Sequence, residues 1–208
     1  LLQRYFLCFI FITSCFCSSE AQSYSTVESQ QIRISTLNSD SLYQIGHELF
    51  DEGRFDTAIS IIRIAHVKAK ESGNWELSNS ATNLIGVCYK EMNQFDSSFV
   101  YLNRSLATAT EHLDTLQMAR AHHGLGDMYF DIGDYPTAQQ HLLESLHLKQ
   151  ISGHTDETAA TLLNLGNLNE KLMLFDEART YQKAALVVRK RTNHYFGIAS
   201  CYINLGVL

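Results

Sequence analysis

Nine histidines have the greatest potential for chemistry in this chain, because imidazole binds transition metals and transfers protons near neutral pH. His122, His123 and His141 are close enough in sequence to meet within one pair of helices. No two histidines are spaced i, i+4, and no cysteine joins them. His47-Glu48 begins like the helix of a zinc protease, but Asp51 stands where the second histidine ligand belongs. The sequence therefore predicts no metal site.

Motifs for nucleophilic catalysis and phosphate binding are missing as well. Neither a Gly-x-Ser-x-Gly elbow nor a glycine-rich phosphate loop occurs. The densest basic run, residues 189–191, falls in the last turn of a predicted helix, where cations favour the negative end of the helix dipole. We interpret this run as helix capping rather than as a phosphate patch. We therefore expect no catalytic residue, no cofactor and no enzymatic activity.

Composition and charge exclude further classes of protein. The chain has 208 residues, of which 45% are hydrophobic and 18% charged, with one proline, so it is neither collagen-like nor disordered. Sixteen Lys and Arg against twenty-two Asp and Glu give a net charge of -6. Binding to a phosphate backbone needs a basic field, so we expect no nucleic acid partner.

The glycines carry the strongest pattern, a period of forty residues. Glycines that each follow Ile or Leu recur at Gly46, Gly86, Gly126, Gly166 and Gly206. Nine positions after four of them comes an aromatic residue, Phe55, Phe95, Tyr135 or Phe175. Small residues occupy the positions twelve and nineteen after the glycine, as in Ala58 and Ala65.

This period predicts pairs of helices. Apolar residues around each glycine recur at spacings of three and four, and a second helical stretch follows. Between the two lie Gly53, Asn93 and Gly133, which tolerate the left-handed conformation that closes a helix. Met173 breaks this column, so we expect the fourth turn to be built differently.

We predict nine helices, alternately named A and B, and no strand. Their approximate bounds are 40–52, 55–71, 75–92, 95–111, 115–132, 135–151, 155–172, 175–191 and 195–208. In each pair we expect the glycine of helix A to face the alanine or serine of helix B. Neighbouring pairs must stack to form a core.

These residues resemble the tetratricopeptide repeat family, whose A helix carries a Leu-Gly pair and, three positions later, an aromatic residue. Tyr89 and Tyr129 fill that column, whereas Leu49 and Asn169 depart from it. The usual repeat has about 34 residues. The period of forty is similar to a longer-helix subtype found in G-protein-signalling modulators and bacterial extracytoplasmic sensory proteins. The resemblance covers residues 40–208 and implies an all-α fold, an α-solenoid of antiparallel helix pairs wound into a right-handed superhelix.

The resemblance also implies a ligand-binding surface, because the A helices of the family line the concave face. The residues that it places there as peptide-binding candidates are Tyr43, His47, Phe50, Asn83, Lys90, Arg120, His123, Asp127, Phe130, Asn167, Glu170 and Lys171. Acidic residues outnumber basic ones in these columns, so we expect a neutral or basic ligand. The mixed residue types disfavour the clamp that some family members use for C-terminal carboxylates. The other interpretation is a solvated face that binds nothing.

The first 21 residues predict export. Residues 1–4 and the apolar run 5–17 read as the basic and hydrophobic regions of a signal peptide, and thirteen residues are fewer than the roughly 20 that span a bilayer. Cleavage after Ala21, lipidation at Cys15 and an uncleaved anchor are all open. Either of the first two places the mature protein outside the cytoplasm, in the periplasm or the extracellular space, and lipidation would attach it to a membrane.

The rest of the chain divides into a linker or short capping helix at 22–39 and repeats at 40–208. Cys88 and Cys201 remain outside the leader, and we expect two buried thiols rather than a disulfide. Four repeats are complete, and the sequence stops within the expected fifth A helix. We expect that helix to be uncovered and to promote self-association.

Two functions are therefore open. The first is a non-enzymatic scaffold, exported, that binds a protein or peptide segment. The second is the extracytoplasmic sensory region of a larger signalling protein, a histidine kinase, cyclase or DNA-binding regulator. In that case a membrane helix and the output domain would lie beyond residue 208.

Overall fold

The computed structural model describes residues 36–193 and 195–206, so the expected leader and nearly all of the linker lie outside the described residues. The described part contains helices and turns but no strand. The helices are α2 (Ser39–Asp51), α3 (Phe55–Glu71), α4 (Trp75–Glu91), α5 (Phe95–Glu111), α6 (Thr115–Ile132), α7 (Tyr135–Ile151), η1 (Thr155–Glu157), α8 (Thr158–Lys171), α9 (Phe175–Arg191) and α10 (Tyr195–Asn204). The predicted helices are thereby confirmed to within a few residues.

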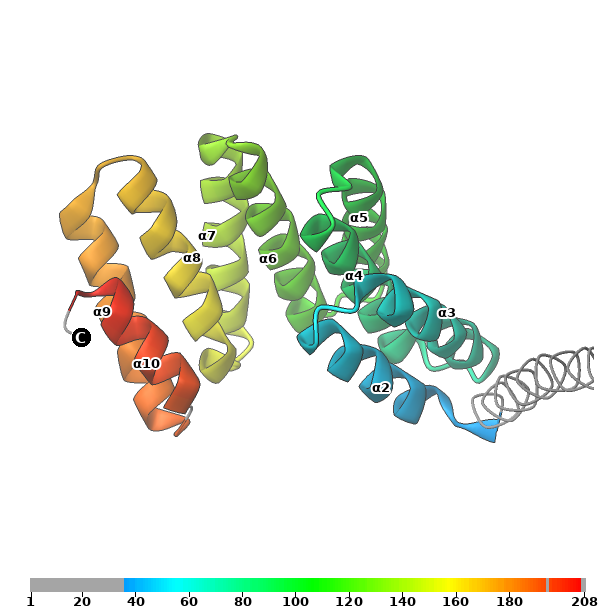
Figure 1. Ribbon diagram of the computed structural model, residues 1–208. Coiled ribbons are helices and arrows are strands. Elements are labelled where there is room, and N and C mark those ends of the chain that lie inside the picture. Colours follow the sequence, from blue (N-terminus) through cyan, green and yellow to red (C-terminus); the bar gives the residue numbers. More distant parts are fainter. Residues whose placement is uncertain (1–35, 194, 207–208) are drawn as a thin grey trace, which may run out of the picture.

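Consecutive helices pack as antiparallel pairs, and the pairs form one continuous row (Figure 1). The A helices are α2, α4, α6, α8 and α10, and the B helices are α3, α5, α7 and α9. Each A helix from α2 to α6 packs against the next A helix, and each from α2 to α8 packs against its own B helix. The fold is therefore the predicted all-α solenoid.

The core lies between each B helix and the A helices on either side of it. Ile62 of α3 packs with Ile85 and Cys88 of α4 in one cluster of buried side chains. Leu142 of α7 packs in the same way with Leu165 of α8. Every repeat therefore completes its apolar surface with the following one, which is how solenoid repeats gain stability.

The A-helix glycine makes room for a large side chain of the following B helix. A Cβ atom added at Gly126 would lie 2.7 Å from Cγ and 3.1 Å from the backbone nitrogen of Leu142. The residue sixteen positions after the glycine is the closest side chain in all four complete repeats, namely Ile62, Leu102, Leu142 and Gln182. The expectation that this glycine faces Ala or Ser is therefore wrong. Those small residues are buried on the same helix face, one turn before and one turn after the large side chain.

Leu102 shows how this contact links repeats. Its side chain is fully buried, and it lies against Gly86 of its own A helix. A Cβ atom at Gly124, on the next A helix, would lie 2.7 Å from Cδ2 of Leu102. A single leucine thus fills the space between α4 and α6.

The turns recur every twenty residues, twice as often as the repeat. A residue with positive φ closes each helix from α2 to α9, at Gly53, Gly73, Asn93, Leu113, Gly133, Gly153, Met173 and Asn193. Met173, with φ +61°, bonds its N–H to the Glu170 carbonyl at 3.0 Å, as Asn93 bonds to Lys90 at 2.9 Å. The expectation that the turn inside the fourth repeat, at Met173, is built differently is therefore wrong. The backbone bonds impose the left-handed conformation, and the exposed Met173 side chain meets no obstacle.

The last helix is shorter than predicted. α10 ends at Asn204, and Gly206, expected within a helix reaching residue 208, has φ +68°. The N–H of Gly206 bonds to the Ile203 carbonyl at 3.0 Å, which closes the helix. Among the described residues no B helix packs over Gly206 to hold it in a helix. Tyr195 and Ile203 of α10 are exposed, and self-association through this helix stays a prediction.

The expectation about the cysteines is confirmed. Cys88 and Cys201 are free and buried. Burial raises the pKa of Cys88 to about 12, so this thiol is unreactive near neutral pH. None of the helices described is long and apolar enough to cross a membrane.

Replacing the central glycine of the third repeat tests the packing contact. We expect Gly126→Leu to lower the free energy of unfolding by about 1–3 kcal/mol or more, because the side chain must displace Leu142 and its backbone. Urea denaturation measures the change. The control, Gln140→Leu, places the same side chain at an exposed site of α7. Equal stabilities of the two variants would contradict the contact.

Replacing Met173, which has positive φ in the turn between α8 and α9, with glycine should stabilise the protein. Met173→Gly should raise the free energy of unfolding by about 1 kcal/mol, since glycine adopts positive φ without the steric cost paid by other residues. Met173→Ala removes the same side chain but keeps the cost, so it should give no gain. Equal unfolding midpoints in urea for the glycine and alanine variants would show that the turn holds no such strain.

Candidate functional site

Two adjoining cavities lie along the A helices and form what we call the inner groove. The first has a volume of about 410 Å³ and is lined by Tyr43, His47, Ser80, Asn83, Leu84, Gln117 and Arg120. The second, of about 360 Å³, is lined by Asn83, Arg120, His123, Lys149, Asp156, Glu157, Ala160 and Arg189. The cavities share the lining residues Asn83 and Arg120, so they are neighbours, and together they extend across the first four repeats.

Five of the twelve predicted binding residues line the inner groove. They are Tyr43, His47, Asn83, Arg120 and His123. They come from α2, α4 and α6, whose forty-residue period places equivalent positions side by side. Their role in binding stays a prediction.

Lys90 and Asp127 instead belong to an ion cluster between α4 and α6, in which only the lysine is buried. The Nζ atom of Lys90 lies 2.6 Å from Glu91, 2.7 Å from Asp127 and 3.6 Å from Asp131, and Lys90 is 8% exposed. Burial alone would lower the pKa of Lys90, but the Asp127 and Glu91 carboxylates outweigh it and raise the pKa. Asn164 of α8 donates to Asp127 at 3.0 Å, which extends the cluster to a third A helix.

The remaining predicted residues lie outside the inner groove. Phe50 and Phe130 pack against Phe55 and Tyr135 across the turns of their own repeats, with ring centroids 5.6 and 5.7 Å apart. Three further candidates are in the fourth repeat. Asn167 accepts from Asn204 of α10 at 3.3 Å, Glu170 accepts from Gln182 of α9, and Lys171 is exposed at the end of α8.

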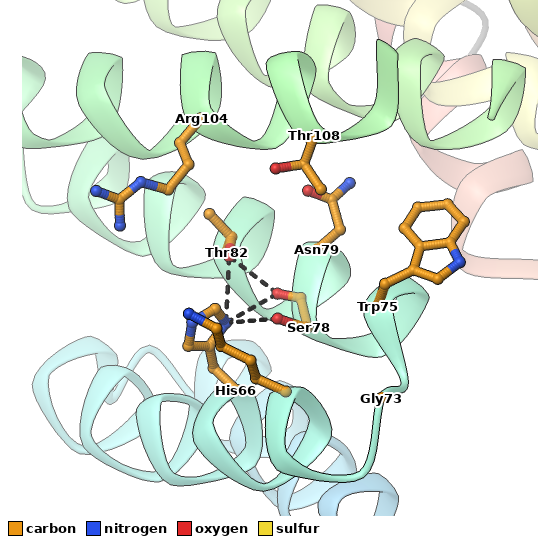
Figure 2. A pocket seen from close by; sticks show the side chains of 9 residues that line it. His66, Gly73, Trp75, Ser78, Asn79, Thr82, Arg104 and Thr108 are labelled. Carbon is orange, nitrogen blue, oxygen red and sulfur yellow. Dashed lines mark hydrogen bonds between the residues drawn. The ribbon is translucent and has the colours of Figure 1, made fainter. Parts of the chain in front are cut away.

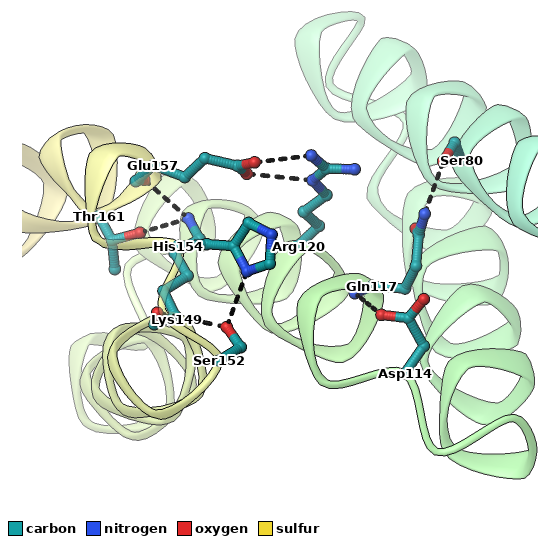
Figure 3. A network of polar contacts seen from close by, with 9 residues as sticks. All are labelled: Ser80, Asp114, Gln117, Arg120, Lys149, Ser152, His154, Glu157 and Thr161. Atoms are coloured by element: carbon teal, nitrogen blue, oxygen red, sulfur yellow. Dashed lines mark hydrogen bonds and ion pairs between the residues drawn. The ribbon is translucent and has the colours of Figure 1, made fainter. Parts of the chain in front are cut away.

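A polar network fixes the middle of the inner groove (Figure 3). Arg120 donates from Nε and Nη2 to the two carboxylate oxygens of Glu157, at 3.1 and 2.8 Å. Partial burial would raise the pKa of Glu157, but the Arg120 guanidinium more than offsets it and lowers the pKa. On the other side of α6, Gln117 donates to the Ser80 hydroxyl at 2.9 Å. These bonds tie α6 to α4 on one side and, on the other, to η1, which leads directly into α8.

Sequence reasoning missed Lys149 and treated Arg189 only as a helix cap. Both lie on B helices and still line the second cavity. Lys149 is 3% exposed, and its Nζ atom donates to the Glu157 carbonyl at 3.2 Å and the Thr161 hydroxyl at 2.9 Å (Figure 3). Burial lowers its pKa to about 8. The spacing could have revealed it, since Lys149 continues the buried helix face of Leu142 and Ser145.

Another cavity, of about 470 Å³, lies over α4 between the B helices α3 and α5 (Figure 2). The Nδ1 atom of His66 lies 3.0 Å from the Ser78 carbonyl, 3.1 Å from the Ser78 hydroxyl and 3.3 Å from the Thr82 hydroxyl. These groups join α3 to α4. We therefore assign this surface to helix packing.

The three histidines considered as metal ligands separate into two environments. His122 and His141 meet between α6 and α7 with their Nδ1 atoms 2.9 Å apart, whereas His123 faces Thr161 at 3.2 Å. Across residues 36–193 and 195–206 no three His, Cys, Asp or Glu residues are grouped so that they could hold a metal ion.

Comparison with known proteins identifies the repeat. Two family models, both described as tetratricopeptide repeat, match residues 76–151 and 158–193. No curated protein matches the sequence significantly.

Several solved structures share the fold. BtubC (BKLC) from P. vanneervenii is 18% identical, with a TM-score of 0.62, over 90% of this chain and 80% of that one. The apo form of RapI is 22% identical, TM-score 0.62, over 89% of this chain and 52% of that one. A Rap protein complexed with Competence and Sporulation Factor is 20% identical, TM-score 0.64, over 79% and 48%. The chain therefore spans about half the length of the two Rap proteins, and at these identities the likeness shows the fold alone.

His123, a partly buried histidine of the inner groove, predicts a pH dependence of stability. Burial, with a smaller contribution from the Lys149 cation, lowers the pKa of His123 from 6.5 to about 4. Between these values the unfolded chain binds more protons than the folded one, so stability is full above pH 6.5 and falls as the pH drops towards 4. Burial also lowers the pKa values of His122 and His141, which adds to the effect.

We expect the free energy of unfolding of the wild type to fall when the pH is lowered from 7.5 to 5.0. In His123→Gln this fall should be smaller by about 1–3 kcal/mol. Urea denaturation at the two pH values measures both. His147→Gln, which replaces an exposed histidine of α7, should behave like the wild type. An identical loss in wild type and His123→Gln would mean that His123 is not kept neutral by its surroundings.

Proposed function

Because this chain belongs to the tetratricopeptide repeat family, we propose that it is a protein-interaction scaffold whose inner groove binds an extended segment of a partner. The observation that carries this proposal is the pair of joined cavities along α2, α4, α6 and α8, with volumes of about 410 and 360 Å³. Cavities of this size receive side chains, and their connection at Asn83 and Arg120 favours a segment that runs from one to the other.

The lining of the groove suits recognition of a peptide. Tyr43 offers a phenol, His47 an imidazole and Asn83 an amide, and these groups stack on side chains or hydrogen-bond to a peptide backbone. The Arg120–Glu157 and Gln117–Ser80 bonds hold the helices behind them in place. A rigid lining limits the entropy lost on binding.

The comparisons support binding but do not name a partner. The Rap protein with the same fold was solved in complex with Competence and Sporulation Factor. We propose that the present chain likewise acts by binding a ligand and without catalysis. Its partner would be a protein or peptide whose chemistry is set by the groove residues of this chain.

Export is part of the proposal. It rests on the signal-peptide pattern of residues 1–21, which lie outside the described residues. A sensory region of a signalling protein would use the same groove and would differ in the output to which binding is coupled. The scaffold remains our preferred interpretation because it requires only the surfaces described above.

Selection from a displayed peptide library tests the proposal. Peptides that bind the whole chain should lose at least tenfold in affinity for the double variant His47→Ala/Asn83→Ala, which removes groove contacts. Phe99→Ala, at an exposed position of the B helix α5, should leave the affinity within twofold. Calorimetry gives the affinities, and circular dichroism shows that each variant is folded. Peptides that bind all three proteins equally well would place the binding surface elsewhere.

A further inference from the structure

The second cavity of the inner groove contains two cations in equivalent positions of successive repeats, of which Lys149 is buried and Arg189 is partly buried. The residue twenty-three positions after the glycine is Ala69 in the first repeat and Ala109 in the second, and both are fully buried. The same position holds Lys149 in the third repeat and Arg189 in the fourth. A position that serves packing in two repeats therefore carries positive charge where the cavity lies.

The carboxylates of this cavity are already paired with other cations. Glu157 accepts from Nε and Nη2 of Arg120, and Asp156 accepts from Arg191 of α9. Lys149 meets only a carbonyl and a hydroxyl, which are neutral acceptors. The cavity thus keeps an excess of positive charge in a chain whose net charge is -6.

Two donors of the cavity are buried without a hydrogen-bond acceptor. In the described part of the chain neither Nε of Arg189 nor Nδ2 of Asn83 has a partner. Leaving a buried donor unpaired is costly, so native proteins rarely do so without another role for the group. Arg189, Asn83 and Lys149 reach the cavity from α9, α4 and α7, and a ligand that satisfies all three must be an acceptor.

We propose that this cavity binds the side-chain carboxylate of an acidic residue in the partner segment, held by Lys149, Arg189 and Asn83. The proposal deepens the proposed function and rests on it, since the acidic residue belongs to the segment in the inner groove. A carboxylate accepts several charge-assisted bonds at once, which matches the three donors. A side chain can enter this cavity while the rest of the segment follows the neighbouring cavity lined by Tyr43 and His47.

This inference reverses the ligand charge expected from the sequence. The expectation of a neutral or basic ligand counted Glu91, Asp127 and Asp131 as free acidic groups. In the structure these three carboxylates gather around the single cation of Lys90, and none of them lines the second cavity. Within the second cavity, the charges without a carboxylate partner are those of Lys149 and Arg189.

The protonation of Lys149 gives the proposal a second readout. The charged groups that face its amine are the Glu157 carboxylate and the Arg120 guanidinium, with His123 neutral near pH 7. A carboxylate bound beside Lys149 would favour its charged form and raise its pKa above the present value of about 8. Binding should accordingly weaken above that pH.

The experiment titrates the whole isotope-labelled chain with capped tripeptides at pH 7. Acetyl-Gly-Glu-Gly-amide should shift the Arg189 Nε–H signal and raise the Lys149 pKa, read from its Cε resonance. Acetyl-Gly-Gln-Gly-amide should do neither. Equal binding of the Gln peptide, tighter binding of acetyl-Gly-Gly-Gly with a free C-terminus, or tighter binding of inorganic phosphate would overturn the proposal.

Variants separate this proposal from the proposed function. Lys149→Met and Arg189→Met should each lower the affinity for the Glu peptide at least tenfold. Lys183→Met, at an exposed position of α9, should leave that affinity unchanged. Should either cavity variant fail to fold, the wild-type titration still decides the question. If library-selected peptides bind the groove equally well in wild type and Lys149→Met, the carboxylate proposal fails and the scaffold stands. If the Glu peptide binds as expected but the affinity of no library peptide depends on His47, the carboxylate proposal stands and the proposed binding of a segment in the inner groove fails.

Discussion

The fold depends on one contact, between the glycine of each A helix and the large side chain sixteen residues later on its B helix. Because Gly126 has no side chain, Leu142 lies directly against the α6 backbone. The small residues one turn before and after it, Ala138 and Ser145, let the two helices stay close along their length. With turns that close every twenty residues, the same geometry recurs and stacks the A helices side by side. The inner groove is a consequence of that stacking.

Most of the fold could be predicted from the sequence because the period of forty has no insertion. Helix bounds, alternation and fold class follow from the spacing of glycine, aromatic and small residues. The backbone conformation of individual residues could not be predicted in the same way. Met173 adopts the turn conformation because backbone bonds on both sides impose it, which residue type does not reveal. Gly206 has the residue type of a packed glycine, but in the described residues it closes α10, because the context of a residue decides between the two roles.

The candidate site could be predicted only in part. The offset from the glycine correctly brings five candidates together, including Asn83 and Arg120, because position along an A helix determines which way a residue faces. The charge of the groove could not be obtained by counting columns. It depends on where each ion lies, and three of the counted carboxylates gather around Lys90 instead of lining the second cavity. Lys149 and Arg189 were missed as groove residues because they lie on B helices, although the replacement of Ala69 and Ala109 by cations is visible in the sequence.

The central claim is that the stacked A helices form a groove with a positive cavity that holds an acidic partner segment. A crystal structure of the whole chain with a selected partner peptide tests this most directly. The account predicts a peptide that lies across α2, α4 and α6, with a side-chain carboxylate within hydrogen-bonding distance of Lys149 Nζ and Arg189 Nε. A peptide bound over α3 and α5, or one that crosses the groove and leaves the cavity without a carboxylate, would contradict the account.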